Sequence, residues 1–458
     1  MGFAADTSDV AGAILKADTV TVVSHIDADG ITSEAILAQA ISQEGINVRS
    51  VFVRQLEPLT MRHVPKDDSL KVFVDLGAGQ QNLLEEHGLT ERDAVIIDHH
   101  VAQPAETPYL QVNGLPYGHT KLSAAGIAYF VATHLDDINT RLAPLAVIGN
   151  VGDMMAREHC GLIGPAREIV SDGVREGLIV CRERDLNCYG LSTRPVHVSL
   201  GYCDDPFIPR ISNNTQGALE FLEKLEIPLR TARGRWRVWE EYSPEEKRTV
   251  ISALVQQLIA HRQPVDRLFS ETYYFPDEPL QTPLRNASEY ATLLNACGRW
   301  AKPAIGAAVC RGDRGTVYRE AEHMLRHHRS IIRELVQYIH DRGVTELSHL
   351  QYIHVGDRFP DTIVGIGAGI SLSKLSWHKP MMVLCYLPDD PELVKVSMRT
   401  NERMVSKGID LQKALQIASE EVGGAGGGHN IAAGAFIPKT AEKEFAHRVN
   451  RILREQSA

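Results

Sequence analysis

Short apolar, β-branched runs that end directly in acidic or imidazole side chains constrain the fold of this chain most strongly. The clearest is the run 94–97, which is followed by Asp98, His99 and His100. Such runs are typical of buried parallel strands, and open α/β sheets bind their ligands at the carboxyl ends of the strands. The tripeptide alone fits either a divalent-metal centre or a polar loop with a capping aspartate, so partners elsewhere in the sequence must decide.

A second cluster follows the apolar run 19–23. His25, Asp27 and Asp29 stand at i, i+2 and i+4, directly before Gly30. In an extended segment this spacing places all three side chains on one side. The cluster is interpreted either as a set of metal ligands or as an aspartate-rich turn closed by the glycine.

Two further aspartates end predicted elements. Asp75 follows the apolar run 70–74, and Asp153 follows a helical pattern over 142–148. Either one alone is more often a helix cap or a turn residue. Four successive element ends with carboxylates, at the intervals of an alternating β/α domain, instead predict one shared site. Mixed imidazole and carboxylate ligands favour Mn²⁺, with Mg²⁺ as an alternative, and a pair of such ions suits phosphoryl-ester hydrolysis.

Composition narrows the class of protein. The 458 residues have room for two or three domains, and 43% hydrophobic with 23% charged residues is typical of globular proteins. We expect no membrane span and no signal peptide, and therefore a cytoplasmic protein. Seven scattered cysteines predict neither a zinc ribbon nor a disulfide framework. The net charge of −10 argues against non-specific coating of nucleic acid but permits a local basic channel.

These motifs resemble those of the DHH phosphoesterase superfamily. By that resemblance, His25 and Asp27 bind one metal ion, Asp29 and His99 bind the other, and Asp75 and Asp153 are shared. The resemblance also implies that His100 faces the scissile phosphate and that Asp98 orients His99. Asn113 matches a residue of the family, but Gly114 and Leu115 depart from its pattern, which leaves the role of the 113–119 loop, including His119, open.

The middle of the chain resembles the archaeal RecJ-like proteins, also called GINS-associated nucleases. The resemblance is carried by the segments 202–212 and 284–299. Two other segments are candidates for nucleic-acid contact. The segment 233–239 interleaves arginines with tryptophans, and the segment 311–333 carries arginines and histidines along a predicted helix. A solvated helix face and core tryptophans are the structural alternatives.

The C-terminal region holds a predicted phosphate grip. Ser397 and Arg399 would point to one face of a strand, and the glycine run 423–428 before His429 exposes backbone N–H groups. The pairing resembles the DHHA1 domain, which implies that Ser397, Arg399, Gly427, Gly428 and His429 bind the substrate backbone. The glycine-rich stretch 362–370 lacks a Walker ending and is predicted to be a structural strand, turn and helix.

The sequence thus predicts an α/β protein. A parallel-sheet DHH domain (1–200) would precede a mostly helical insertion (201–325), a helical linker (326–345) and a smaller α/β DHHA1 domain (346–458), with a cleft between the two α/β domains. By resemblance, the function is a two-metal exonuclease of single-stranded nucleic acid in replication or repair, with DNA and the 5′-to-3′ direction favoured and a GINS-type partner implied. The alternatives are a phosphodiesterase of short oligoribonucleotides or cyclic dinucleotides and a non-catalytic replisome scaffold.

Overall fold

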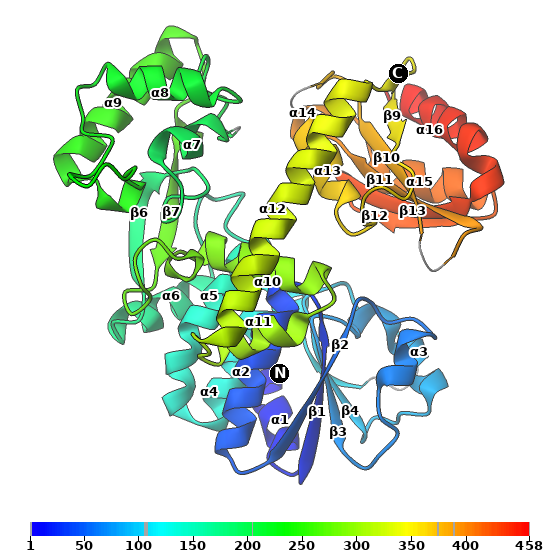
Figure 1. Ribbon diagram of the computed structural model, residues 1–458. Helices are drawn as coiled ribbons and strands as arrows, with labels where there is room; N and C mark the ends of the chain where they lie inside the picture. The colour runs from blue at the N-terminus through cyan, green and yellow to red at the C-terminus, as the bar shows by residue number, and fades with distance from the viewer. Residues whose placement is uncertain (1, 105–108, 204, 373–374, 388–389, 458) are drawn as a thin grey trace. The chain divides into compact units, whose positions relative to one another are not determined.

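The computed structural model describes residues 2–104, 109–203, 205–372, 375–387 and 390–457. The chain forms two compact units, Met1–Leu325 and Arg326–Ala458. Helix α12 (Thr316–Arg342) runs from the first into the second (Figure 1). None of the helices in the described part of the chain is both long and apolar enough to span a membrane.

A five-stranded sheet lies at the centre of the first unit. Its order is β2-β1-β3-β4-β5, and every neighbouring pair is parallel. The strands are β1 (Thr19–His25), β2 (Asn47–Val53), β3 (Leu70–Val74), β4 (Ala94–Ile97) and β5 (Leu110–Val112). All four residues of β4 are buried, as expected of a parallel strand covered on both faces. The predicted α/β class is confirmed.

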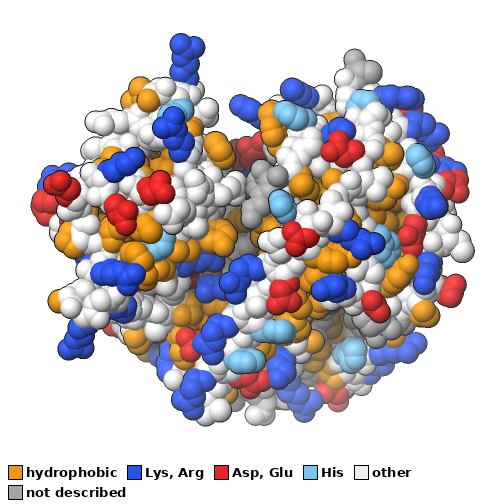
Figure 2. Space-filling model, turned by 45° about the horizontal axis from the view of Figure 1, so that its top comes forward, with side chains coloured by type: hydrophobic (Ala, Val, Ile, Leu, Met, Phe, Trp, Pro, Cys, Tyr) orange, Lys and Arg blue, Asp and Glu red, His pale blue; other side chains and the backbone are white. Residues whose placement is uncertain are grey.

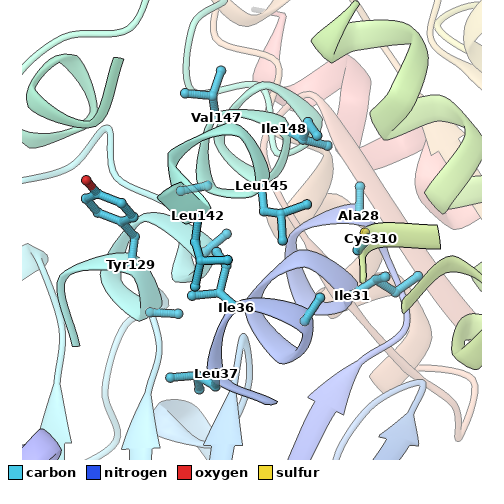
Figure 3. Close-up of a cluster of buried hydrophobic side chains, with 14 of the residues drawn as sticks. Ala28, Ile31, Ile36, Leu37, Tyr129, Leu142, Leu145, Val147, Ile148 and Cys310 are labelled. Carbon is cyan, nitrogen blue, oxygen red and sulfur yellow. The ribbon is translucent and has the colours of Figure 1, made fainter. Parts of the chain in front are cut away.

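Helices cover the sheet and supply most of the core. Figure 3 shows Ala28, Ile31, Ile36 and Leu37 of α2 (Ala28–Gln43) in a cluster of buried hydrophobic side chains that also includes Tyr129. The helices of this part are α1 (Phe3–Ile14), α2 (Ala28–Gln43), α3 (Gln81–His87), α4 (Ala124–Leu135), α5 (Ala143–Gly152) and α6 (Pro165–Arg175). Short 3₁₀ turns complete it: η1 (Thr60–His63), η2 (Ala78–Gln80), η3 (Leu115–Tyr117) and η4 (Asp137–Leu142).

A smaller lobe of the first unit has its own core around the fully buried Trp239. Its antiparallel strands are β6 (Val180–Leu186) and β7 (Phe269–Tyr274), and its helical segments are α7 (Val196–Gly201), α8 (Thr215–Glu223), η5 (Trp239–Glu241), α9 (Pro244–Ala260) and η6 (Asp266–Leu268). The following elements return to the main core against α2 and α5: η7 (Pro283–Arg285), α10 (Ala287–Arg299) and α11 (Pro303–Cys310).

The second unit is a mixed six-stranded sheet in the order β12-β13-β11-β10-β9-β8. Only β9 and β10 pair in parallel. The strands are β8 (Thr345–Glu346), β9 (Gln351–His354), β10 (Met381–Tyr386), β11 (Leu393–Arg399), β12 (Ala425–Gly428) and β13 (Ala432–Pro438). The other elements are α13 (Val364–Leu372), α14 (Glu402–Val405), α15 (Leu411–Glu420), η8 (Lys439–Ala441) and α16 (Glu442–Gln456).

The glycine-rich stretch 362–370 differs from its prediction. It contains no strand, and helix α13 begins at Val364 after a turn. Its glycines serve close packing, because a Cβ at Gly367 would lie 2.3 Å from a Leu335 methyl group and one at Gly365 would lie 2.7 Å from the Arg399 guanidinium. A β-like composition is overridden here by contacts with α12 and β11.

Candidate metal centre

The predicted ligands meet at the carboxyl edge of the parallel sheet. His25 is the last residue of β1, Asp75 follows β3, and the Asp98–His100 tripeptide follows β4. These three strands are neighbours in the sheet. Asp153 comes from the C-terminal end of α5, which packs against α2.

Three groups of ligand atoms form at this edge, each with its atoms within 4.8 Å of one another. The first two hold the predicted ligands, and the third joins Asp75 and the Asp98–His100 tripeptide. In the first, His25 Nδ1 lies 3.1 Å from Asp27 Oδ2 and 3.2 Å from Asp75 Oδ2. In the second, His99 Nε2 lies 3.4 Å from Asp153 Oδ2 and 4.0 Å from Asp29 Oδ2. The other oxygen of Asp75, Oδ1, lies 3.4 Å from His99 Nε2. Asp75 therefore stands between the first two groups.

Local backbone structure fixes these side chains. Asp27 is the N-cap of α2, where its Oδ1 accepts the Gly30 N–H at 3.0 Å. Asp29 is in the first turn of α2, and its side chain reaches the N-terminus of α4, where its two oxygens accept the N–H groups of Ala124 and Ala125 at 2.8 and 2.9 Å. Asp75 has a left-handed backbone with φ of 59°. Aspartate tolerates this region better than most residues, and such backbone strain concentrates at functional sites.

The carboxylates repel one another in a buried setting. Burial and the charges of Asp27 and Asp29 raise the pKa of Asp75 well above its usual range. Burial and the charge of Asp29 raise the pKa of Asp153 to about 8, and burial also raises the pKa of Asp29. Among the described residues, their ion pairs are with His25 and His99 only. This donor set and its excess negative charge fit divalent cations.

His100 is held differently from the metal-ligand candidates. Its Nδ1–H donates to Asp98 Oδ1 at 2.7 Å, and the pKa of His100 is raised mainly by this hydrogen bond. Asp98 also accepts the backbone N–H groups of His99, His100 and Ala78. The expectation that Asp98 orients the ring of His99 therefore differs from the structure, in which the Asp98 carboxylate meets the ring of His100 and only the backbone of His99.

The 113–119 loop is hydrogen-bonded to the Asp98–His100 tripeptide. Asn113 Nδ2 donates to the His100 carbonyl at 2.7 Å, and Asn113 Oδ1 accepts the Leu115 N–H. Gly114 lies so close to His119 that a Cβ would be 2.9 Å from the His119 carbonyl oxygen. The His119 ring packs edge-on against Phe3 at 5.2 Å between ring centroids. Asn113 thus positions the loop, and His119 packs away from the ligand groups.

Helix α10 contributes contacts to the centre that the sequence patterns did not reveal. Asn295 Oδ1 accepts the buried Ala28 N–H at 3.0 Å, in the first turn of α2. A Cβ at Gly298 would lie only 1.7 Å from the carbonyl oxygen of Ile26. Burial lowers the pKa of Arg299, and the charge of Asp27 acts in the opposite direction. The only sequence signal was the periodic 284–299 stretch, which said nothing of its target.

The predicted phosphate grip is assembled within the second unit. Ser397 pairs with Gly434, which in turn pairs with Gly427, so the three residues form one row across β11, β13 and β12. Arg399 pairs with Ala432, whose N–H and carbonyl close a turn with His429. Gly428 enters that turn with φ of 134°, a conformation that favours glycine. All five predicted residues, Gly428 included, therefore lie in or beside this three-strand row.

Two arginines in each of the arginine-rich candidate segments form ion pairs. Arg235 pairs with Glu241 at 2.6 Å and Arg237 with Glu246 at 2.6 Å, while Trp239 is a core residue. In the second segment, the guanidinium of Arg311 contacts Glu34, and that of Arg314 contacts Glu278. On the face drawn in Figure 2, basic side chains are interspersed with acidic and hydrophobic ones. These contacts favour the structural alternative for the paired arginines.

Comparison with known domain families finds three matches in succession. The N-terminal domain of the DHH family matches residues 19–150, the DHH-CID domain matches residues 188–269, and the DHHA1 domain matches residues 351–455. The first contains all the candidate ligands except Asp153, and the last contains the row around Ser397 and Arg399. The members of the DHH family are phosphoesterases.

Whole-chain comparisons agree with the domain matches. An uncharacterized protein of Methanocaldococcus jannaschii is 25% identical over 448 residues, which cover 95% of this chain and 94% of that protein. The fold resembles that of exonuclease RecJ bound to manganese (TM-score 0.58, 16% identity, 99% of this chain and 94% of that chain). It also resembles that of CDC45 from Entamoeba histolytica (TM-score 0.63, 12% identity, 98% and 99%). The chain therefore belongs to the DHH/DHHA1 superfamily of phosphoesterases and has the RecJ-like fold.

Proposed function

We propose that this protein is a divalent-metal-dependent hydrolase that cleaves the phosphodiester bonds of single-stranded nucleic acid. The observation that carries the proposal is the pair of ligand groups that meet at Asp75. One consists of His25, Asp27 and Asp75, and the other of Asp29, His99 and Asp153. Asp75 reaches both through its two oxygens, an arrangement suited to two neighbouring cations.

The donor chemistry supports Mn²⁺ as the favoured ion and Mg²⁺ as an alternative, since imidazole and carboxylate ligands occur together. When bound, such a pair of cations supplies a nucleophile from water and charge stabilisation for the attacking and leaving oxygens. The N-terminus of α4 keeps Asp29 in place by two backbone hydrogen bonds. The Asn295 contact does the same for the first turn of α2.

His100 and Arg299 are proposed to act on the phosphate. Asp98 can only accept a hydrogen bond as a carboxylate, so His100 carries a proton on Nδ1 and its Nε2 remains for substrate. The raised pKa of His100, which comes chiefly from Asp98, favours an imidazolium that stabilises negative charge on the phosphate. Arg299 is half-buried, near Asp27, and adds positive charge close to the ligand loop.

Ser397, Arg399 and the Gly427–His429 segment are proposed to hold the neighbouring phosphates. A hydroxyl, a guanidinium and backbone N–H groups are suited to phosphate oxygens. DNA and the 5′-to-3′ direction are proposed over RNA and the opposite polarity, as the sequence resemblance to the RecJ-like nucleases implies. Short oligoribonucleotides and cyclic dinucleotides are the competing substrates.

The test is digestion of strands labelled at either end, as DNA and as RNA, with Mn²⁺ or Mg²⁺. We expect shortening of single-stranded DNA from its 5′ end by the wild-type protein and loss of hydrolysis in Asp75→Asn and Asp153→Asn. Asp93→Asn is the matched control. Asp93 directly precedes β4, at the amino-terminal end of the strands and away from the ligand groups, and its carboxylate accepts hydrogen bonds from Thr90. Retained metal-dependent hydrolysis in both site variants would refute the assignment.

A second candidate function is a replisome scaffold with a GINS-type partner. The likeness to the fold of CDC45 favours it. The ligand groups argue for hydrolysis, because a scaffold has no need of buried, mutually repelling carboxylates at a strand edge. Failure of every strand and dinucleotide to be hydrolysed, with or without metal, would leave the scaffold as the better proposal.

A further inference from the structure

A turn before β10 in the second unit displays an exposed tryptophan. Trp377 lies in the turn 376–379, with 42% of its surface exposed. A single exposed aromatic side chain is common on protein surfaces, so the surrounding contacts must decide whether Trp377 has a role. Those contacts show that the turn is built to hold the ring in place.

Side-chain amides from two other elements fix the turn. Gln351, fully buried in β9, donates through Nε2 to the carbonyl oxygens of Ser376 and Lys379 at 2.6 and 2.9 Å. Asn401 donates through Nδ2 to the carbonyl oxygen of Trp377 itself at 2.8 Å. Three of the four turn carbonyls are therefore bound from outside the turn, which reduces the freedom of the exposed residue.

The indole is flanked by one cation and one aromatic ring. The guanidinium carbon of Arg403 lies 5.3 Å from the centre of the Trp377 ring, and the His378 ring centre lies 3.8 Å away at a tilt of 47°. Both Arg403 and His378 are exposed. A partly exposed indole with a guanidinium over its ring is suited to single-stranded nucleic acid, because bases stack on aromatic rings and phosphates bind cations.

The turn lies at the end of the sheet that carries the proposed phosphate grip. Met381, the first residue of β10, is the register partner of Arg399, and Arg399 pairs on its other side with Ala432 of the His429 turn. Asn401, which binds the Trp377 carbonyl, is two residues after Arg399. The indole and the proposed phosphate donors thus share one end of the same sheet.

We propose that Trp377, with Arg403 beside it, is a stacking platform for a base of the single-stranded nucleic acid whose backbone is held by Arg399. The inference rests on the proposed function for the location of the strand, but not for its cleavage. The platform recognises the π-face common to all bases and therefore adds affinity without selecting sequence. The indole of the turn would add a base contact to the phosphate contacts of Ser397, Arg399 and His429.

Binding without catalysis tests the platform. Anisotropy of a labelled single-stranded oligonucleotide is measured in EDTA at low salt, for wild type, Trp377→Ala and Trp377→Phe. A matched control is Tyr386→Ala, because Tyr386 is half-buried and also has a cation over its ring, Lys439 Nζ at 4.2 Å, but lies at the other end of β10. We expect about tenfold weaker binding for Trp377→Ala, the size of one lost base–aromatic stack, with most affinity kept by Trp377→Phe and by Tyr386→Ala.

A strand of the same length with abasic sugars separates stacking from charge. The wild type and Trp377→Ala should bind it equally, since it offers phosphates but no base. Unchanged affinity of Trp377→Ala for the normal strand, or an equal loss on the abasic strand, would overturn the platform, as would a wild type that binds no strand. If the wild type binds through Trp377 yet hydrolyses nothing when Mn²⁺ is added, the platform stands and the hydrolase proposal fails.

Discussion

Replacing Gly298 by alanine tests how far the metal centre depends on α10. The glycine Cα faces the carbonyl oxygen of Ile26, which lies between the ligand candidates His25 and Asp27. An added Cβ would lie 1.7 Å from that oxygen, whereas real Cβ atoms essentially never come within 3.0 Å of another heavy atom. The helix and the loop must therefore move apart by about 1.3 Å.

That displacement falls on backbone atoms, which cannot rotate away as a flexible side chain can. Because a misplacement of about 1 Å in a catalytic group can reduce the rate about 100-fold, we expect a loss of this order in the metal-dependent hydrolysis rate. We expect the displacement of Ile26 to disturb the neighbouring His25, whose Nδ1 lies 3.2 Å from Asp75 Oδ2 in the wild type. Weaker binding of Mn²⁺ should accompany the loss of rate.

The assay combines calorimetric titration with Mn²⁺ and hydrolysis of a labelled single strand. Gly306→Ala is the control, because its added Cβ would meet only side-chain atoms of Leu294, Ile31 and Cys297 at 3.2–3.4 Å. Circular dichroism and the melting temperature establish that both variants fold. Normal Mn²⁺ affinity and a normal rate in a folded Gly298→Ala protein would show that α10 does not position the ligand loop.

Three further predictions concern the same centre. Asn295→Ala leaves the buried Ala28 N–H unsatisfied and should lower the free energy of unfolding by about 1–2 kcal/mol, measured by urea denaturation. Adding Mn²⁺ to EDTA-treated protein should raise Tm more at pH 8 than at pH 5. The pKa of Asp153 is raised to about 8 in the metal-free protein. The protonated carboxyl therefore adds to the free energy of unfolding in full below the ordinary pKa of about 4, and this contribution is lost as pH rises towards 8. Asp98→Asn should lower the pKa of His100 and shift the alkaline limb of the pH–rate profile to lower pH.

Each of these has a distinct contrary outcome. An unchanged unfolding midpoint for Asn295→Ala would mean that water replaces the amide at Ala28. An equal metal-induced rise in Tm at both pH values would contradict the raised pKa of Asp153. A pH–rate profile that keeps its alkaline limb in Asp98→Asn would remove His100 from the proposed role as a charged group.

The sequence was most informative where function depends on strand ends. Runs such as 94–97 identify parallel strands by composition, and a parallel sheet brings their carboxyl ends together regardless of the loops between them. That topology alone was sufficient to predict that His25, Asp75 and His99 would meet. Strand alternation likewise predicted that Ser397 and Arg399 share a face, whereas the register that places Ser397 in a row with glycines of β12 and β13 came from the structure.

Contacts between distant elements could not be obtained in this way. Asn295 accepts a hydrogen bond from Ala28, which is 267 residues away in the chain. The hydrophobic periodicity of a helix does not predict which distant loop its end will contact. The same limit applies to Arg235 and Arg237. They lie in a segment whose composition is typical of nucleic-acid binding, but in the fold each of them forms an ion pair with a glutamate.

The sequence by itself predicted the parallel sheet, a second α/β domain and the residues that meet at the candidate metal centre, because hydrophobic periodicity and strand polarity are local properties. Only the tertiary structure decided that Asp98 binds the ring of His100, that α10 supports the ligand loop and that Trp377 is held on a fixed turn. These depend on rotamers and on packing between segments far apart in the chain, where a shift of about 1 Å determines whether a contact forms.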